Sequence, residues 1–316
     1  RDVSGDGIEV DAEELGEGTE STVFRGTLGG AHLVAVKRVK ICGYDCLQRF
    51  KRECEILAKL SPHPGIACPL GFDPTPGKRA FILPLMDNGD LGTLLHDKGV
   101  VLGEDLALVF ALQAADALAH VHGMDVIHKD VKSSNLLVTG DWKRCLLSDF
   151  GLAECVQKDE RTDAQTRADI IRANRGPTGG IQRVRIVGTL VSLAPEVLSN
   201  QPHSSASDVY SWAILCNELL SCTVPYSDSL MDNPKPHTIL DQSFNQAELM
   251  QAIAKGLRPA TSPDTCAWAN TLITTTWCGE PSQRPTAATI ADNMRSKGVS
   301  GEGFAPKGRR YRADEA

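Results

Sequence analysis

Residues 128–135 of the chain read His-Lys-Asp-Val-Lys-Ser-Ser-Asn, between two apolar runs. The sequence therefore predicts a polar loop that is held in place by buried segments on both sides. Within the loop, Asp130 can accept a proton from a hydroxyl group, Lys132 can neutralise phosphate charge, and Asn135 can offer an amide oxygen to a metal ion. Phosphoryl transfer needs positioned charges of this kind, although Asp, Lys and Asn in a surface loop are also ordinary turn residues.

A glycine-rich segment, residues 15–23, reads Leu-Gly-Glu-Gly-Thr-Glu-Ser-Thr-Val. Apolar and β-branched runs follow it on both sides of Gly29-Gly30, which predicts two strands joined by a hairpin turn. A dinucleotide-binding turn would instead have to open a helix. Gly16 and Gly18 are therefore expected in a strand–loop–strand. The second strand leads to Lys37, although a lysine on a strand is usually a solvent-facing residue.

An amphipathic helix is predicted after Lys37, because apolar residues recur there at intervals of three or four. These residues are Leu47, Phe50, Cys54, Leu57 and Leu60. Glu53 borders the apolar stripe, whereas Glu55 is better explained as a solvated charge. Glu53 is therefore the better placed of the two to hold an ion pair. A second amphipathic helix is predicted over residues 104–122.

The tripeptide Asp149-Phe150-Gly151 directly follows a predicted strand, 19 residues beyond Asp130. A carboxylate at Asp149 and an amide oxygen at Asn135 suit Mg²⁺, a hard ion that shares its coordination shell with substrate phosphates. Taken alone, the tripeptide is also compatible with a simple β-turn.

Together, these segments resemble the motifs of eukaryotic-type protein kinases, which occur in this order and at similar spacing. The chain departs from the family pattern at four positions: Ser21 stands in place of a third Gly, Lys129 in place of Arg, Val131 in place of Leu, and Ala213 in place of Gly. In the family, an arginine at the position of Lys129 usually binds a phosphate on the activation segment, here residues 149–196, through its flat guanidinium. Lysine offers only a point charge. We therefore expect the activity to depend weakly on phosphorylation of that segment.

The amino-acid sequences of three segments are most similar to those of the tyrosine-kinase-like group of Ser/Thr kinases, which includes plant-type receptor-like and Raf-like kinases. The segments are Asp130–Asn135, Asp208–Trp212 and Arg284–Thr286. By this resemblance, Asp208 supports the backbone of the catalytic loop and Arg284 pairs with Glu196. The dipeptide Gly188-Thr189, together with Lys132, implies protein substrates with Ser or Thr acceptors.

The resemblance implies ATP as the phosphoryl donor and Mg²⁺ as the metal ion. The residues it places around the nucleotide are Leu15, Gly16, Gly18, Val23, Ala35, Lys37, Glu53, Leu83 and Met86. It also implies Lys37 as the ion-pair partner of Glu53. Because Pro84 has no N–H group, Met86 is expected to donate to the adenine base. Asp90 either reaches the ribose or caps a helix, and the sequence favours neither.

The resemblance also assigns roles to the polar residues. Asp130 and Lys132 are the catalytic residues, because Asp130 orients the acceptor hydroxyl and Lys132 offsets charge on the moving phosphoryl group. Asn135 and Asp149 are the metal ligands. The alternative is a kinase-like binding module without catalysis, and it would be favoured if Lys37, Asp130 or Asp149 were missing. All three are present.

The implied fold is α+β and bilobal, with a small β-rich lobe that carries one long helix and a larger, mostly helical lobe. We expect a flexible lead-in at 1–7 and a kinase domain at 8–297. Within that domain the small lobe covers about 8–86, the large lobe about 87–297 and the activation segment 149–196. We expect a disordered polar tail at 298–316.

Composition limits the remaining alternatives. The 316 residues include 33 basic and 40 acidic ones, so a net charge of −7 gives no case for a nucleic-acid-binding protein. The ten cysteines contain no Cys-x-x-Cys and are expected to be reduced. No apolar run approaches the ~20 residues needed to cross a bilayer, so no membrane segment is expected within this chain. We expect a cytoplasmic protein or, if Arg1 is not its true start, the cytoplasmic domain of a membrane receptor kinase.

Overall fold

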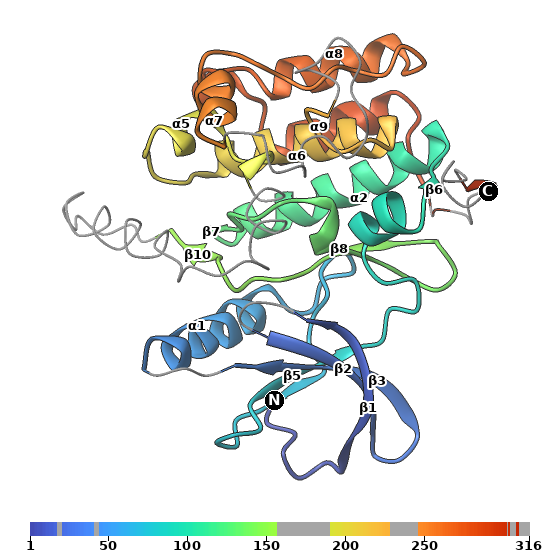
Figure 1. The fold of residues 1–316 in the computed structure, drawn as a ribbon, viewed down its shortest axis with the longest axis vertical. Coiled ribbons are helices and arrows are strands. Elements are labelled where there is room, and N and C mark those ends of the chain that lie inside the picture. The colour runs from blue at the N-terminus through green and yellow to red at the C-terminus, as the bar shows by residue number, and fades with distance from the viewer. Residues whose placement is uncertain are drawn as a thin grey trace.

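A computed structural model describes residues 1–17, 21–40, 44–156, 190–227, 246–301, 303 and 308–309. The chain forms two lobes, a small one rich in strands and a larger helical one (Figure 1). This confirms the predicted bilobal α+β fold. The small lobe contains an antiparallel sheet in the order β1-β2-β3-β5-β4. Its strands are β1 (Ile8–Glu17), β2 (Ser21–Leu28), β3 (His32–Val39), β4 (Gly71–Asp73) and β5 (Ala80–Pro84).

The predicted hairpin between β2 and β3 is present, with Leu28 paired to His32. Gly29 and Gly30 form its turn with φ angles of 62° and 71°. Positive φ angles are common in tight hairpin turns, and glycine adopts them without steric cost. The hairpin fixes the register that sets Val23 beside Lys37.

Helix α1 (Tyr44–Leu60) packs beside the sheet, as the apolar stripe predicted. Phe50 and Leu57 are buried, and the ring of Phe50 lies 4.9 Å from that of Phe81 on β5. The helix ends at Leu60, one residue before the sequence Ser61-Pro62. This packing turns Glu53 toward the strand that carries Lys37.

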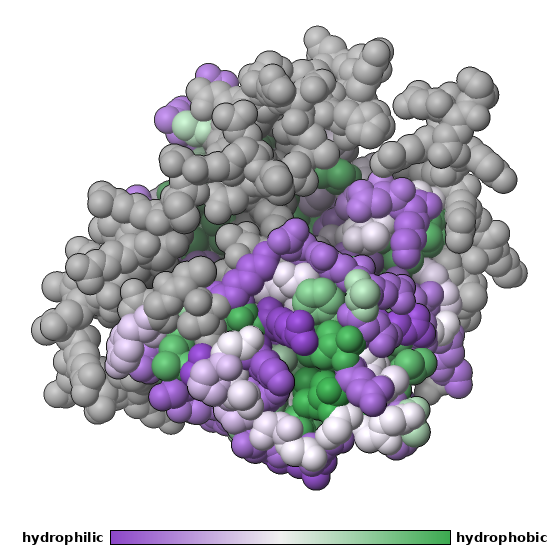
Figure 2. Space-filling view, turned by 60° about the horizontal axis from the view of Figure 1, so that its bottom comes forward, coloured by the Kyte–Doolittle hydropathy of each residue, from purple (hydrophilic) through white to green (hydrophobic). Residues whose placement is uncertain are grey.

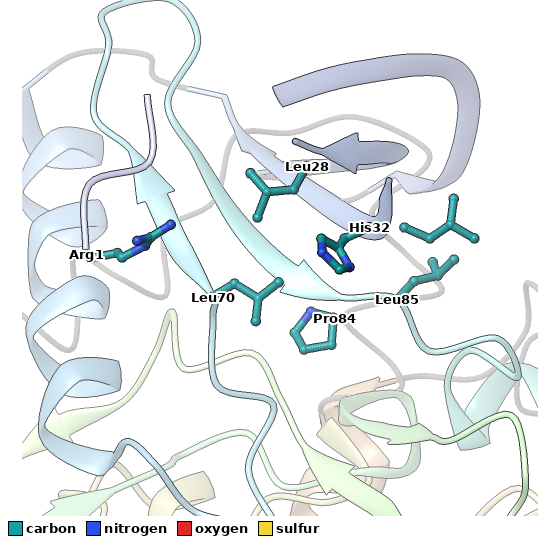
Figure 3. Close-up of a pocket in the computed structure, with 7 residues that line it drawn as sticks. Arg1, Leu28, His32, Leu70, Pro84 and Leu85 are labelled. Atoms are coloured by element: carbon teal, nitrogen blue, oxygen red, sulfur yellow. The ribbon is translucent and has the colours of Figure 1, made fainter. Parts of the chain in front are cut away.

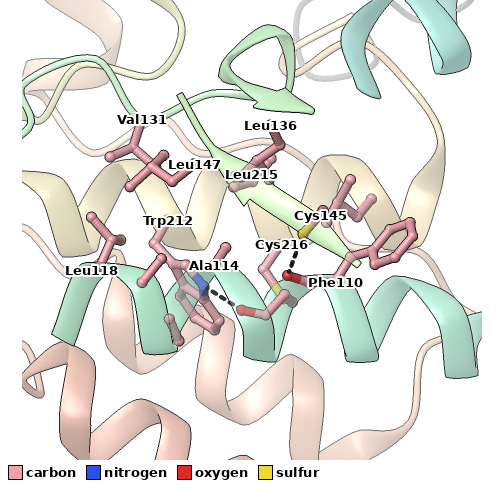
Figure 4. Packing of buried hydrophobic residues seen from close by; sticks show 14 of the residues in the cluster. Phe110, Ala114, Leu118, Val131, Leu136, Cys145, Leu147, Trp212, Leu215 and Cys216 are labelled. Atoms are coloured by element: carbon pink, nitrogen blue, oxygen red, sulfur yellow. Dashed lines mark hydrogen bonds between the residues drawn. The ribbon is translucent and has the colours of Figure 1, made fainter. Parts of the chain in front are cut away.

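The large lobe is built around two buried helices, α2 (Glu104–Gly123) and α6 (Ser205–Ser221). The indole N–H of Trp212 on α6 donates to the Ala111 carbonyl of α2 at 2.9 Å, and the Cys145 thiol contacts the Phe110 carbonyl (Figure 4). The other helical elements are η1 (Thr93–Asp97), η2 (Ser133–Asn135), α5 (Pro195–Leu198), α7 (Gln246–Ala254), α8 (Ala267–Thr276), η3 (Pro281–Gln283) and α9 (Ala287–Ser296). The short strands are β6 (Val100–Val101), β7 (Val126–Ile127), β8 (Leu136–Val138), β9 (Cys145–Leu147), β10 (Glu154–Cys155) and β11 (Gly308–Arg309).

Helix α2 is the one helix of the described residues that is long and apolar enough to cross a membrane. It lies in the interior of the large lobe, where α6 and α9 pack against it, and most of its residues are buried. An apolar helix with protein on several sides belongs to a hydrophobic core. We therefore assign α2 to the core of this lobe.

Both ends of the chain differ from the expected flexible segments. Val3 is 0% exposed, and its N–H donates to the Phe72 carbonyl at 3.1 Å, so the expectation of a flexible lead-in is wrong at this residue. In the tail, the Gly303 N–H donates to the Lys143 carbonyl at 2.8 Å, and β11 pairs with β6. A disordered tail is therefore wrong at these described positions. At both ends these residues pack against the folded core.

Gly303→Ala is expected to destabilise the protein by about 1–3 kcal/mol, because a Cβ there would overlap the Trp142 carbonyl oxygen and press on Leu106 and Phe110. The midpoint of urea unfolding measures this loss. Gly279→Ala is the matched control, since a Cβ at that exposed position meets nothing within 4 Å. Equal midpoints for the two variants would show that the tail contact at Gly303 contributes nothing.

Candidate active site

Three charged residues from three elements meet between the lobes. The Lys37 ammonium on β3 lies 3.0 Å from the Glu53 carboxylate on α1 and 2.8 Å from the Asp149 carboxylate after β9. The predicted ion pair of Lys37 with Glu53 is therefore present. The Lys37 and Glu53 side chains are largely buried, whereas the Asp149 carboxylate is half-exposed. A lysine fixed between two carboxylates is well placed to bind an anionic group that approaches from the open side.

The charged forms of this trio stabilise one another. Burial alone would lower the pKa of Lys37, but the neighbouring Asp149 and Glu53 carboxylates raise it above its ordinary value. Burial alone would raise the pKa of Asp149, but the Lys37 ammonium lowers it from 3.8 to about 2. Both groups are therefore ionised throughout the physiological pH range.

Asp149 should make stability depend on pH under acid conditions. Its pKa is lower in the folded chain than in the unfolded one, so its ionised form stabilises the fold above about pH 4, and this contribution is lost as the pH falls toward 2. We expect the wild-type protein to be more stable than Asp149→Asn at neutral pH, and the difference between them to shrink over that acid range. Urea unfolding at a series of pH values measures both. A difference that stays constant down to pH 2 would contradict the lowered pKa.

Asp208 on α6 binds the backbone of the predicted catalytic loop. Its buried carboxylate accepts hydrogen bonds from the backbone N–H groups of His128 and Lys129, both at 2.8 Å. The same carboxylate contacts His122 Nε2 at 2.9 Å. Burial alone would raise the pKa of Asp208, but the hydrogen bonds with His122 and with the His128 backbone lower it. The expected support of the loop by Asp208 is thus present, with His122 as a further contact.

The three polar residues of the loop converge on one another. The Lys132 ammonium lies 2.7 Å from the Asp130 carboxylate. The side-chain amide nitrogen of Asn135 donates to the Asp130 carboxylate at 3.0 Å and to its backbone carbonyl at 2.7 Å. Asp130 and Asn135 are both buried, so these contacts fix the carboxylate in one orientation.

The hairpin of β8 and β9 brings Asn135 next to Asp149. Leu136 pairs with Leu147, and the Ser148 N–H and hydroxyl donate to the Asn135 carbonyl at 2.8 and 3.0 Å. Asp149 adopts a φ of 60°, a conformation that costs energy for any residue other than glycine. Such strain is typical of functional sites.

The donor atoms of Asn135 and Asp149 fit Mg²⁺. Because the amide nitrogen of Asn135 already donates twice to Asp130, its oxygen is the atom left for a cation. A carboxylate and an amide oxygen are hard ligands of the kind that Mg²⁺ prefers. Phe150 anchors the segment beside them, since it is buried and its ring lies 4.7 Å from that of His128.

Four of the predicted nucleotide-binding residues lie on one face of the small-lobe sheet. Val23 pairs with Lys37, and Ala35 pairs with Leu83. Cross-strand partners share a face, and so do residues two apart on one strand. Lys37 therefore lies on the same face as the apolar side chains Val23, Ala35 and Leu83.

The remaining predicted positions follow the same strands. Gly16 pairs with Val23 where β1 meets β2, and the neighbouring Leu15 is exposed. Met86 lies two residues beyond the end of β5. Gly18 and the dipeptide Gly188-Thr189 lie outside the described residues.

The comparison with known families decides the identity of the fold. The model of the protein kinase domain matches residues 10–294. The chain belongs to the protein kinase family. Its relatives include a "Protein kinase and PP2C-like domain-containing protein" from Arabidopsis thaliana, which is 32% identical over 289 residues. That match covers 89% of this chain and 42% of the relative.

A protein of the same name from Oryza sativa subsp. japonica is also 32% identical, over 89% of this chain and 43% of the relative. The "Probable serine/threonine-protein kinase drkC" of Dictyostelium discoideum is 30% identical, over 89% of this chain and 34% of the relative. The kinase domain described here thus spans less than half the length of each of these relatives.

One of the two roles that the sequence left open for Asp90, the helix cap, is present in the structure. Its carboxylate accepts hydrogen bonds from the Thr93 N–H and hydroxyl, both at 2.8 Å. Asp90 therefore caps the turn at η1. The sequence analysis missed the contacts of Lys129 with Glu154 and of Ser133 with Glu218. These pairs join segments that only the tertiary fold brings together, and no local pattern indicates them.

The small lobe also carries a cavity of about 560 Å³ that is separate from the active site. Leu28, His32, Leu70, Pro84 and Leu85 line it together with Arg1 (Figure 3). None of the predicted site residues is among its lining residues. Apolar residues also gather on the outer face of the small lobe, where hydrophilic residues surround them (Figure 2).

Proposed function

We propose that this kinase domain transfers the γ-phosphoryl group of ATP to Ser or Thr hydroxyl groups of protein substrates, with Mg²⁺, in signal transduction. The observation that carries the proposal is the assembled pair of clusters, Lys37 with Glu53 and Asp149, and Asp130 with Lys132 and Asn135. Specificity for Ser and Thr is supported by Lys132, two residues after Asp130, and by the name of the Dictyostelium relative, a probable serine/threonine-protein kinase.

Each residue has a distinct task in this reaction. Asp130 orients the acceptor hydroxyl and takes its proton as the new O–P bond forms and the bond from the γ-phosphorus to ADP breaks. Lys132 offsets negative charge on the moving phosphoryl group, and Lys37 binds the phosphates of ATP. Asp149 and Asn135 would hold Mg²⁺, which when bound neutralises charge on the phosphate oxygens.

We place the domain in the tyrosine-kinase-like group and in the cytoplasm. Membership of this group is supported by the amino-acid sequences of Asp130–Asn135, Asp208–Trp212 and Arg284–Thr286. A reducing location is supported by the nine cysteines of the described chain, all of which are free.

The proposal is tested by incubating the protein with MgATP and an array of peptides that contain Ser, Thr or Tyr as the single acceptor. We expect phosphate on Ser and Thr peptides, and none with Asp149→Asn. Binding of ATP without transfer to any peptide would identify a kinase-like binding module instead. Transfer to Tyr alone would overturn the Ser/Thr assignment.

A further inference from the structure

The residue before Asp130 takes part in an ion pair that the proposed reaction does not use. The Lys129 ammonium contacts the Glu154 carboxylate, and the two side chains are 18% and 47% exposed. Lys129 is also fixed at its backbone, where its N–H donates to Asp208 and its φ is 70°. Because Asp130 follows directly in the chain, any force that holds Lys129 also acts on the position of Asp130.

A short backbone ladder determines where Glu154 lies. Strand β10 pairs antiparallel with β7, so that Glu154 is opposite Ile127 and Cys155 opposite Val126. The Val156 N–H adds a hydrogen bond of 2.8 Å to the Asp125 carbonyl. Glu154 lies three residues after Gly151, so the ladder joins the start of the activation segment to the strand that precedes the catalytic loop.

The carboxylate of Glu154 is the negatively charged group that contacts the Lys129 ammonium. His203 is a nearby titratable group, and burial, followed by the positive charge of Lys129, lowers its pKa. His203 is therefore neutral at physiological pH. The carboxylates of Asp208, Glu196 and Glu154 also face His203, but those of Asp208 and Glu196 have other donors, namely the loop backbone and Arg284.

We propose that Glu154 is a positioning residue, whose carboxylate holds Lys129 and thereby Asp130 in the geometry for transfer without a phosphate in residues 157–189. Phosphorylation of such a segment acts by giving a negative charge to a basic residue near the catalytic site. Here a carboxylate of the same chain already provides that charge, so an added phosphate would have to compete with it. The inference rests on the proposed function and deepens it, because it names how the catalytic loop is controlled.

The test uses Glu154→Gln, Lys129→Met and the double variant, each treated with phosphatase, with kcat and the KM for ATP as readouts. We expect phosphatase-treated wild-type protein to keep its kcat. Each single variant should lose about tenfold in kcat, as for one charge-assisted hydrogen bond, with its KM for ATP unchanged. Because the two residues act as a pair, the double variant should lose no more than either single one. Glu9→Gln, the same change on the exposed face of β1, is the control.

Two results would overturn the inference: a wild-type kcat in Glu154→Gln, or loss of wild-type kcat on phosphatase treatment alone. Losses that add in the double variant would also count against a pair. Failure of the proposed function is recognised separately, because wild-type protein would then transfer no phosphate to Ser or Thr peptides. In that case amide hydrogen exchange at residues 128–130 still decides the positioning role, since Glu154→Gln must accelerate it and Glu9→Gln must not.

Discussion

Asp130→Asn is expected to lower kcat by about 10²–10⁴-fold and to leave ATP binding intact. An amide has nearly the shape of a carboxylate, but it cannot accept the proton of the substrate hydroxyl. The side chain at 130 lies within hydrogen-bonding distance of Lys132 and Asn135, so the variant retains neighbours that hold it in place. The residues proposed to bind phosphate and metal, Lys37 and Asp149, are untouched by the change.

Asp264→Asn is the matched control, because Asp264 is exposed in the large lobe and belongs to neither cluster. Steady-state kinetics with a Ser peptide measures turnover, and a thermal shift with MgATP measures nucleotide binding. We expect Asp130→Asn to lose turnover and keep the shift, and Asp264→Asn to keep both. Wild-type turnover in Asp130→Asn would remove Asp130 from the mechanism. Loss of the thermal shift would mean that this residue contributes to nucleotide binding.

Much of the active site is predictable because its residues lie at fixed offsets along regular elements. The helical period places Glu53 at the border of the apolar stripe of α1, and the structure shows it beside Lys37. The Asn135 and Asp149 pair follows from one hairpin, which brings two loop ends together. Local periodicity and turn chemistry predict these helices, strands and turns, whereas the two-lobed fold and the roles of the clustered residues are implied by the resemblance to protein kinases.

The contacts that the sequence did not predict depend on how distant segments fit together. Lys129 meets Glu154 only because β10 pairs with β7 in one register, and a shift by one residue would move the carboxylate to the other face. Val3 packs against Gly71, and Gly303 lies close to Leu106 and Phe110. The periodicity of neither terminal segment indicates these contacts.

Arg284→Met is expected to destabilise the protein by about 3–5 kcal/mol, because it leaves a carboxylate without its cation in the interior of the large lobe. The Arg284 side chain is 0% exposed, and its guanidinium donates to both carboxylate oxygens of Glu196 at 2.7 and 2.8 Å. Its other donors reach three backbone carbonyls, those of Ala206, Gly279 and Cys278. Arginine has five N–H groups, so every one of them is used here.

This arrangement explains why the Arg284–Glu196 pair should contribute more to stability than an ion pair of similar geometry on the surface. Arg295 contacts both carboxylate oxygens of Asp116 at 2.5 and 2.6 Å, but its side chain is 49% exposed. Water can replace the lost contacts there, so Arg295→Met should cost less than about 1 kcal/mol. The midpoints of urea unfolding compare the two variants directly. Glu196→Gln, which keeps an acceptor for Arg284, should be less destabilising than Arg284→Met and serves if the latter does not fold. Equal losses at positions 284 and 295 would show that burial does not set the strength of the Glu196 contact.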